Sequence, residues 1–559
     1  MPLPVPHTGF QALVLCGPGV SLNTFTSNPE EYPKCLIPVA NRPMIFYTID
    51  FCKRMGITDI TLVTPPSSLA PLQAALRQNP HLTSIPSPSP SVIAPRDLDM
   101  TTGTAELLRL PEVQNCIKSD FLLLPCDLIC EIPGESLLES WMIFQSALGG
   151  SSTVREGRNA HGPTSSGPGG EQGGRRGGLS VFYQTQGREE SVKGEATDFV
   201  ALAPFEQDEA PAGHTTDLSK LVLSMPMSTL KEKMEHDKGF LVRHSLVDKH
   251  AQVKMLSSYR DAHLYVLPYW VKDFARLNDK FQSVSEDLVG WWAKAEWQEG
   301  LGNKLKMNEI FQRQGHSLPS GEDASHDGES LEEEIDLQSM STTKATSAIA
   351  ESARSATEPQ FASRVKAPSS VSESLKSGSL PPMLAYVQRG SAPFVRRVDS
   401  SAMLLSTSLR LAKLESIEEV GRSAASAFAH NQKVSYPAGV AQRCTVTKSD
   451  CLLDMNVTIE EKCVVKESVI GANSHISSGA RLTRCVVMDG VVVGPRAVLT
   501  GCIIGRRAKI GSECVLKDCE VQDGNVVPDE TDAKNEKFMV FEGLDDDMDE
   551  DFEDEQDEL

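Results

Sequence analysis

The first third of the chain alternates between short apolar runs and longer segments in which apolar side chains recur every three or four residues. A short continuous apolar run is typical of a strand covered on both faces, whereas the longer period is typical of an amphipathic helix. Glycine follows several of these segments, as at Gly17 and Gly56, and marks their ends. The pattern predicts strands over 11–16, 59–64 and 121–124, and helices over 44–55, 69–78 and 135–148.

Strands and helices that alternate in this order predict a Rossmann-like α/β domain with a parallel sheet and right-handed crossovers. In such sheets ligands bind at the carboxyl ends of the strands. Residues 17–22 and 125–127, which follow two of the predicted strands, are therefore the first places to look for chemistry.

A second pattern, with a period of seventeen residues, runs through residues 451–527. One column of this repeat contains cysteine at four of its five positions, and three further columns contain only aliphatic residues. The columns are Cys451, Ser468, Cys485, Cys502 and Cys519; Leu453, Ile470, Val487, Ile504 and Val521; Ile459, Ile476, Val493, Ile510 and Val527; and Val465, Leu482, Leu499 and Leu516.

Each repeat divides into three short sides of six, six and five residues, with one inward aliphatic residue per side. This is the hexapeptide pattern of a parallel β-helix, in which triangular coils stack aliphatic side chains in columns. An amphipathic helix needs a period of about 3.6 residues and a meander a period of about two, so neither explains the repeat. We interpret the cysteine column as packing. His475 precedes the inward Ile476, and we expect it to be exposed, without a role in acyl transfer.

Two segments of low complexity divide the chain. Residues 149–178 contain eleven glycines and almost nothing apolar, which predicts a disordered insertion. The serine-rich stretch 313–382 predicts a disordered linker. We therefore expect a first domain over 10–312, a connecting segment and β-helix over 383–530 with coils from about 445, and an acidic disordered tail over 531–559.

The net charge is −22, from 54 basic and 76 acidic residues, which argues against nucleic-acid binding through a net positive field. Residues 545–559 contain eleven acidic side chains and no basic one, so half of the imbalance lies in a tail that cannot bury itself. Two interpretations of the tail stay open: a solubilising extension, or a segment that contacts a basic surface of a partner.

We expect a cytosolic protein. No apolar run is long enough for a transmembrane helix, and residues 1–10 do not have the pattern of a secretory signal. The thirteen cysteines are then expected to be reduced, and since none forms a CxxC pair we expect no zinc site. We also expect no other metal and no cofactor.

Five ordered motifs carry the candidate chemistry. They read LCGPGVSL at 15–22, YPKCLIPV at 32–39, NRPMI at 41–45, GTAE at 103–106 and LLPCD at 123–127. Together they resemble the signature of the sugar-phosphate nucleotidyltransferases, or pyrophosphorylases. Those enzymes read G-x-G-T-R-L, P-K-P-L-x-P-V, N-K-P and G-T-A, and have a strand that ends in a metal-holding Asp.

The resemblance implies a role for each matched residue. Gly17 and Gly19 would let backbone N–H groups approach phosphates, and Lys34 would stabilise charge on the sugar phosphate. Gly103 would lie on the side of the nucleobase, and Asp127 would hold magnesium. The alternatives for the same residues are a tight turn at the two glycines, a solvated or ion-paired Lys34 and a turn-capping Asp127.

Two departures from the signature matter. Ser21 stands where the enzymes have the Arg that stabilises the departing pyrophosphate, and Cys35 replaces a proline. An uncharged hydroxyl cannot replace a phosphate-clamping guanidinium without losing roughly 3 kcal/mol or more of transition-state stabilisation. We therefore expect a decayed loop with no catalytic residue, and a vestigial nucleotide or sugar-phosphate pocket of Gly17, Gly19, Ser21, Lys34, Gly103 and Asp127.

A decayed nucleotidyltransferase domain followed by a left-handed β-helix resembles the family of the gamma and epsilon subunits of translation initiation factor 2B. The segments DAHLYV at 261–266 and SEDLV at 285–289 look like motifs of the gamma type. The epsilon type adds a helical domain after the β-helix that carries exchange activity, and the residues after Val527 are too few for such a domain.

The resemblance implies a non-catalytic subunit of the guanine-nucleotide exchange factor for initiation factor 2. Its expected partners are the other subunits of initiation factor 2B, above all epsilon, and initiation factor 2 itself, with neither nucleic acid nor membrane bound directly. The alternative is an active sugar-1-phosphate guanylyltransferase, similar to GDP-mannose pyrophosphorylase.

Overall fold

The computed structural model describes residues 9–17, 22–99, 101–153, 176–205, 218–240, 242–316, 380–390 and 393–539. Almost all of them belong to one compact unit, Met1–Ile310 with Leu380–Leu559. The other unit, Phe311–Ser379, is described only where it includes the end of α12 (Met307–His316). Most of the predicted insertion and linker, and residues 540–559 of the predicted tail, lie outside the described residues.

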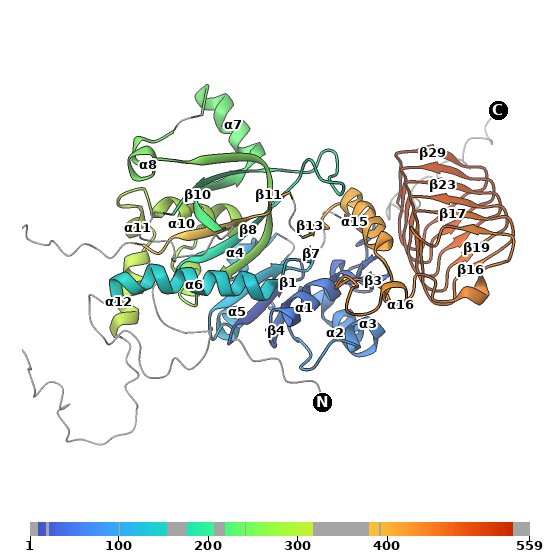
Figure 1. Cartoon of the computed structure of the whole chain (residues 1–559), viewed down its shortest axis with the longest axis horizontal. Helices are drawn as coiled ribbons and strands as arrows, with labels where there is room; N and C mark the ends of the chain where they lie inside the picture. The colour runs from blue at the N-terminus through green and yellow to red at the C-terminus, as the bar shows by residue number, and fades with distance from the viewer. Residues whose placement is uncertain are drawn as a thin grey trace, which may run out of the picture. The chain divides into compact units, whose positions relative to one another are not determined.

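A nine-stranded sheet organises the N-terminal part of the chain (Figure 1). Its parallel section contains four strands, in the spatial order β5 (Ser91–Ile93), β4 (Asp59–Val63), β1 (Gln11–Leu15) and β6 (Phe121–Pro125). The predicted strands are confirmed to within one residue at each end. The predicted helices are α1 (Met44–Arg54) and α2 (Leu69–Gln78).

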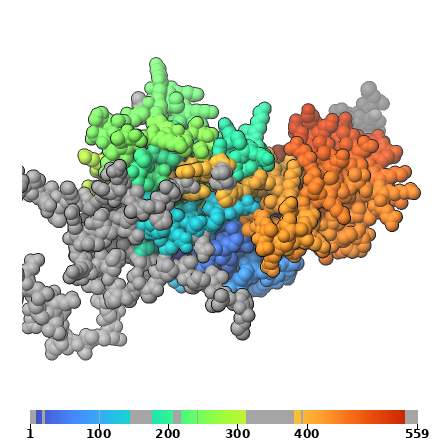
Figure 2. Space-filling view, viewed as in Figure 1, coloured from blue at the N-terminus to red at the C-terminus, as the bar shows by residue number. Residues whose placement is uncertain are grey.

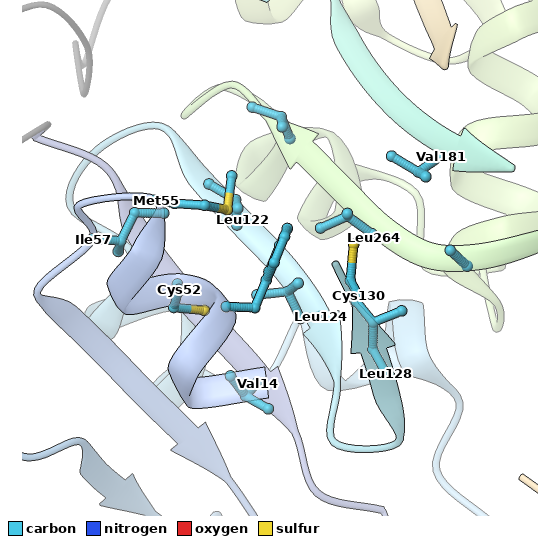
Figure 3. Close-up of a cluster of buried hydrophobic side chains, with 14 of the residues drawn as sticks. Val14, Cys52, Met55, Ile57, Leu122, Leu124, Leu128, Cys130, Val181 and Leu264 are labelled. Carbon is cyan, nitrogen blue, oxygen red and sulfur yellow. The ribbon is translucent and has the colours of Figure 1, made fainter. Parts of the chain in front are cut away.

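The core of this section lies between α1 and the sheet. Cys52 of α1 and Met55, directly after this helix, belong to one buried cluster with Val14 of β1 and with Leu122 and Leu124 of β6 (Figure 3). The continuous apolar runs of β1 and β6 are explained by this burial, because side chains on both faces of the sheet are covered.

The helix α6 (Gly134–Thr153) runs through Gly149 and Gly150, so the predicted helix end at Gly149 is wrong. Glycine inside a helix costs only about 1 kcal/mol relative to alanine. That penalty weakens a helix without forcing it to end.

The rest of the sheet is mixed, in contrast to the predicted parallel arrangement. It continues through β11 (Lys254–Leu267), β8 (Gly178–Gln184), β12 (Met383–Val387), β10 (Leu218–Pro226) and β9 (Asp198–Ala203). The long strand β11 is antiparallel to β6 and β8 and also pairs with β9, so these last five strands close on themselves. A bulge at His263, which has a φ of 52°, allows β11 to bend between its partners.

Two strands of the N-terminal part come from beyond the predicted linker. β12 lies between β8 and β10 in the middle of the closed section. β13 (Val395–Arg397) pairs with β7 (Leu128–Cys130), directly after Asp127. β12 and β13 therefore complete the N-terminal fold, although the sequence predicts only a connecting segment here.

The described residues form further helices, most of them short. They are η2 (Lys34–Leu36), η3 (Pro66–Ser68), α3 (Pro80–Thr83), α4 (Thr104–Leu107), α5 (Pro111–Cys116), α7 (Met227–Asp237), α8 (His244–Lys249), α9 (Val271–Leu277), η4 (Val284–Val289), α10 (Gly290–Ala295), α11 (Leu301–Lys304), α15 (Ser401–Lys413), α16 (Ile417–Val420) and η5 (Pro437–Gly439). None of the helices in the described ranges is long and apolar enough to cross a membrane.

The C-terminal part is a parallel β-helix of three sheets (Figure 1). Its first sheet consists of β14 (Thr445–Val446), β17 (Val464–Lys466), β20 (Arg481–Thr483), β23 (Val498–Thr500), β26 (Val515–Lys517) and β29 (Asp532–Lys534). Its second sheet consists of β15 (Leu452–Leu453), β18 (Val469–Ile470), β21 (Val486–Val487), β24 (Ile503–Ile504), β27 (Glu520–Val521) and β30 (Lys537–Phe538). Its third sheet consists of β16 (Thr458–Ile459), β19 (His475–Ile476), β22 (Val492–Val493), β25 (Lys509–Ile510) and β28 (Val526–Val527).

The seventeen-residue spacing is the register of these sheets. Leu453 pairs with Ile470, Ile470 with Val487, and the column continues through Ile504 to Val521. The inward aliphatic residues and the cysteine column form one buried cluster. All thirteen cysteines of the chain are free. His475 is partly exposed and lies 3.2 Å from Glu460.

The outward face of the second sheet packs against the N-terminal part. Leu452, Val469, Val486 and Ile503 point away from the β-helix interior yet are at most 3% exposed. They cluster with apolar residues of α15, which contacts β18, β21 and β2 (Pro38–Val39). Residues 400–440, in light orange in Figure 2, fill the space beside these coils. The strand β2 pairs with β3 (Arg42–Pro43).

Candidate functional site

Lys34 and Asp127 form a buried ion pair at the carboxyl end of the parallel strands. Lys34 begins η2, and Asp127 lies in the turn between β6 and β7. The Lys34 Nζ is 2.7 Å from the Asp127 Oδ2, and the two side chains are 11% and 2% exposed. Lys34 is therefore ion-paired in the structure, as one of the alternatives from the sequence proposes.

Arg397 supplies a second cation to the same carboxylate. Its Nε lies 3.4 Å from the other oxygen of Asp127, Oδ1. The backbone holds it there, because β13 pairs with β7 and the Val398 N–H donates a 2.8 Å hydrogen bond to the Asp127 carbonyl. Both carboxylate oxygens are therefore engaged by cations of the chain itself.

The pKa values in this pair follow from burial and charge. Burial would raise the pKa of Asp127, but Lys34 and Arg397 outweigh it and hold the pKa well below its usual range. Burial would likewise lower the pKa of Lys34, and attraction to Asp127 raises it above its usual value. Both groups are charged at neutral pH.

More buried charges surround this pair. Arg260 makes a bidentate contact with Asp399, with the shorter distance at 2.5 Å, and lies 3.6 Å from Glu195. The Tyr183 hydroxyl donates a 2.8 Å hydrogen bond to Glu195. His263 also faces the cluster, and burial first, then the charge of Arg397, lowers its pKa well below its usual value. Acidic and basic side chains alternate through the region and leave little net positive charge for a phosphate.

Magnesium does not fit this arrangement. Asp127 is the residue that the sequence motif assigns to the metal, yet Lys34 and Arg397 occupy the two oxygens that the ion would need. In the described part of the chain no three His, Cys, Asp or Glu side chains are placed to hold a metal ion together. We therefore derive no metal-assisted step.

Of the other predicted pocket residues, Gly17 lies near the pair, because its backbone N–H hydrogen-bonds the Cys126 thiol next to Asp127. Gly17 is exposed at the end of β1, whereas Gly19 and Ser21 lie outside the described residues. Gly103 caps α4, where an added Cβ would lie only 2.2 Å from the carbonyl oxygen of Gln282. The adjacent Thr104 hydroxyl accepts a 2.9 Å hydrogen bond from the Val284 N–H.

Three buried thiols belong to the hydrophobic core of the N-terminal part, close to the Lys34–Asp127 pair. Cys16 follows β1, Cys126 follows β6, and Cys35 stands where the resembling enzymes have proline. A hydrogen bond between the Cys16 and Cys126 thiols raises the pKa of Cys16 and lowers that of Cys126. All three are at most 3% exposed, so we interpret them as core side chains.

A shallow pocket lies elsewhere, in the loop between β8 and β9. It is lined by residues 185–187 and 191–195. Among these residues only Glu195 belongs to the charged cluster around Arg260.

Sequence reasoning missed Arg397, Arg260 and Asp399. Arg397 is 270 residues from Asp127 in the chain and follows the predicted linker. No spacing rule connects the two residues. The one available signal was the pair Arg396–Arg397 within the short apolar and basic stretch FVRRV.

Comparison with known proteins bears on both parts of the chain. Residues 447–545 match the family model of the GMPPB C-terminal domain. The gamma subunit of translation initiation factor eIF2B from Schizosaccharomyces pombe (strain 972 / ATCC 24843) is 24% identical over 334 residues. The chain resembles an eIF2B gamma subunit. The match covers 59% of this chain, and the chain spans 60% of the length of that curated relative.

The predicted resemblance and fold class are confirmed. The chain has an α/β nucleotidyltransferase-like domain followed by a left-handed parallel β-helix, the architecture expected of an eIF2B gamma type.

Proposed function

We propose that this chain is a non-catalytic subunit of the guanine-nucleotide exchange factor for initiation factor 2. In this role it pairs with an epsilon-type subunit in the cytosol and promotes exchange of GDP for GTP without catalysing it. The resemblance to eIF2B subunit gamma supports the assignment to the complex.

The contacts of Asp127 carry the non-catalytic part of the proposal. A nucleotidyltransferase needs this carboxylate free for a metal and a cationic residue free for phosphate. Here Lys34 and Arg397 neutralise Asp127 in a buried cluster, so neither the acid nor the lysine is available. The predicted pocket of Gly17, Gly19, Ser21, Lys34, Gly103 and Asp127 is then vestigial.

The test is reconstitution with an epsilon-type subunit from the same organism. GDP release from initiation factor 2 is measured with this chain alone, with epsilon alone and with both together. We expect no acceleration by this chain alone, co-purification of the two subunits, and faster release by the pair than by epsilon. Acceleration by this chain alone, or no association with epsilon, would contradict the proposal.

The alternative function is sugar-1-phosphate guanylyltransferase, which the match to the GMPPB C-terminal domain favours. It is tested by pyrophosphate release from GTP and mannose-1-phosphate in the presence of magnesium. An active enzyme would turn over and would lose activity in Lys34→Ala, whereas a decayed one shows no release above the rate without protein. If Ser21→Arg restores activity from zero, the fold still holds a pocket whose loop has decayed.

A further inference from the structure

Cys16 and Cys126, which pack in the core, are also neighbours across two parallel strands. β1 and β6 pair in register up to Leu15 and Pro125, and the Cys126 N–H continues the ladder with a 3.0 Å hydrogen bond to the Leu15 carbonyl. Adjacent strands of a sheet lie about 4.8 Å apart. This spacing falls within the range of about 4.4–6.8 Å that separates the Cα atoms of disulfide-bonded cysteines.

Both thiols lie on the same face of the sheet. Side chains alternate between the faces of a strand, and Val14 and Leu124, two residues before the cysteines, belong to the cluster under α1 (Figure 3). Cys16 and Cys126 belong to this cluster too, and their thiols share a hydrogen bond. The two sulfur atoms therefore face each other without any movement of the backbone.

The surroundings of the Cys126 sulfur favour its reaction as a nucleophile. It accepts a hydrogen bond from the Cys16 thiol and one from the Gly17 N–H, and the positive charge of Lys34 acts on it as well, whereas burial and Asp127 act in the opposite direction. Hydrogen bonds and a nearby cation stabilise a thiolate, which is the nucleophilic form of cysteine. Cys126 is therefore the attacking thiol of the pair, and Cys16 is placed to react second.

Gly17 provides an approach for a small oxidant. It directly follows Cys16 and is exposed, and a Cβ added to it would meet no atom of the described residues within 4 Å. The two thiols are at most 3% exposed. The approach therefore suits a molecule of the size of hydrogen peroxide and excludes a folded oxidoreductase.

The cysteine column of the β-helix contains a pair with similar geometry but no such approach. Cys485 and Cys502 lie in successive coils, and their thiols also share a hydrogen bond. Both are fully buried. At Gly501, which precedes Cys502, the Asp518 carboxylate fills the space that a Cβ would need. This pair is the internal control for access.

We propose that hydrogen peroxide converts Cys16 and Cys126 into a disulfide, which makes the pair a redox modification site at the carboxyl edge of the parallel strands. The Cys126 sulfur attacks one peroxide oxygen, the O–O bond breaks, and the leaving oxygen takes the thiol proton and departs as water. The Cys16 sulfur then attacks the resulting sulfenic acid of Cys126, the S–O bond breaks, and a second water leaves with the proton of Cys16. The two thiols together lose two electrons, which reduce the peroxide.

The bond would join β1 to β6 at the residues directly before Gly17 and Asp127. It therefore fixes the two strand ends from which the predicted pocket residues follow. A disulfide is reversed by thiols, so the modification is a reversible one.

The experiment exposes the folded full-length chain to hydrogen peroxide and removes the excess. The remaining thiols are blocked with iodoacetamide in urea, and the disulfides are mapped by peptide mass spectrometry. We expect a bond between Cys16 and Cys126 that forms at least about tenfold faster than one between Cys485 and Cys502, and that dithiothreitol removes.

Serine variants separate the roles of the two thiols. Cys16→Ser removes the second thiol, so Cys126 should stop at the sulfenic acid, which dimedone traps when the chain is unfolded. In Cys126→Ser, Cys16 should remain a thiol. The matched control is Cys130→Ser, which removes another buried thiol of the same core and should form the disulfide at the wild-type rate. Unchanged circular dichroism confirms that each variant is folded.

Three outcomes with the wild-type chain would overturn the proposal. If both thiols stay reduced, or if Cys485 and Cys502 are oxidised as fast, the open side of Gly17 gives no selective access. A bond between Cys16 and Cys35, whose thiol also contacts Cys16, would assign the modification to another pair. Sulfonic acid at Cys126 without a disulfide would show that Cys16 does not reach the sulfenic acid.

Discussion

At the scale of single residues, we expect the buried ion pair Lys34–Asp127 to contribute strongly to stability. Asp127→Asn leaves Lys34 and Arg397 buried without their carboxylate, and Lys34→Met leaves the carboxylate with Arg397 alone. Breaking a buried pair costs about 3–5 kcal/mol, so we expect each variant to lose stability on that order in urea denaturation. The double variant Lys34→Met/Asp127→Leu should lose less than the two single losses added together.

The exposed pair Lys413–Glu467 is the control. Its side chains are 54% and 40% exposed, and exposed pairs contribute less than about 1 kcal/mol. Glu467→Gln should therefore leave the urea midpoint nearly unchanged. If Asp127→Asn also left the urea midpoint nearly unchanged, Lys34 would be stabilised by water and not by Asp127.

The buried carboxylate of Asp261 should make the stability of the fold depend on pH. Its carboxylate is 3% exposed, and burial, together with nearby Asp198, raises its pKa to about 7. An unfolded Asp titrates near about 3.9, so between roughly pH 4 and 7 the folded state binds more protons than the unfolded state, and stability falls as pH rises.

Asp261→Asn removes this titration while it keeps a group that can accept the 2.8 Å hydrogen bond from the His263 N–H. The free energy of unfolding of the variant minus that of the wild type should rise by a few kcal/mol from about pH 4 to 7 and then level off. Both chains are measured in the same buffers, so titrations common to both cancel. A difference that is flat with pH would contradict the raised pKa.

At the scale of elements, β12 joins the chain after the long linker to the sheet formed before it. It pairs with β8 and β10, and its residues Met383, Leu384 and Ala385 are fully buried. A protease site inserted within residues 317–379 should therefore give two fragments that stay associated after cleavage, because separation would remove a central strand. Co-elution in size-exclusion chromatography without denaturant is the measurement.

Fragment 1–379 expressed alone provides the control, since it lacks β12 and Arg397. We expect it to aggregate or to bind fragment 380–559 when the two are mixed. A well-behaved monomer with the melting temperature of the intact chain would show that β12 is dispensable.

The elements also show which features can be predicted from sequence. β1, α1 and α2 were predicted almost residue by residue, because their patterns are local and their burial follows from neighbouring elements. The β-helix was predicted because its long-range pairs recur at a fixed spacing of seventeen residues. β12 and Arg397 act across a linker with no repeat, so nothing in the local pattern reveals their partners. The candidate site was therefore predicted in part. Lys34 and Asp127 come together as the motifs indicate, but Arg397, the second cation on Asp127, lies outside the motifs.

At the scale of the whole molecule, the β-helix and the nucleotidyltransferase-like domain share one apolar interface. Val486 points outward from β21 and is 2% exposed, because α15 and its neighbours cover it. The Asn41 side chain adds a 2.9 Å hydrogen bond to the Ile470 carbonyl, and Arg507 lies 3.0 Å from Glu31 at the exposed edge. Apolar burial carries most of this interface, since exposed ion pairs contribute little.

Val486→Asp tests whether this interface couples the two parts. The substitution buries a charge between them but leaves the inward columns of the β-helix intact, so the parts should unfold separately, with two transitions in calorimetry in place of one. Val492→Asp is the matched control, because Val492 points outward from a neighbouring strand of the same coil and is 39% exposed. It should keep the single transition. If Val486→Asp also unfolds in one step at an unchanged temperature, the two parts are not coupled through this face, and their stability has to be assigned to each separately.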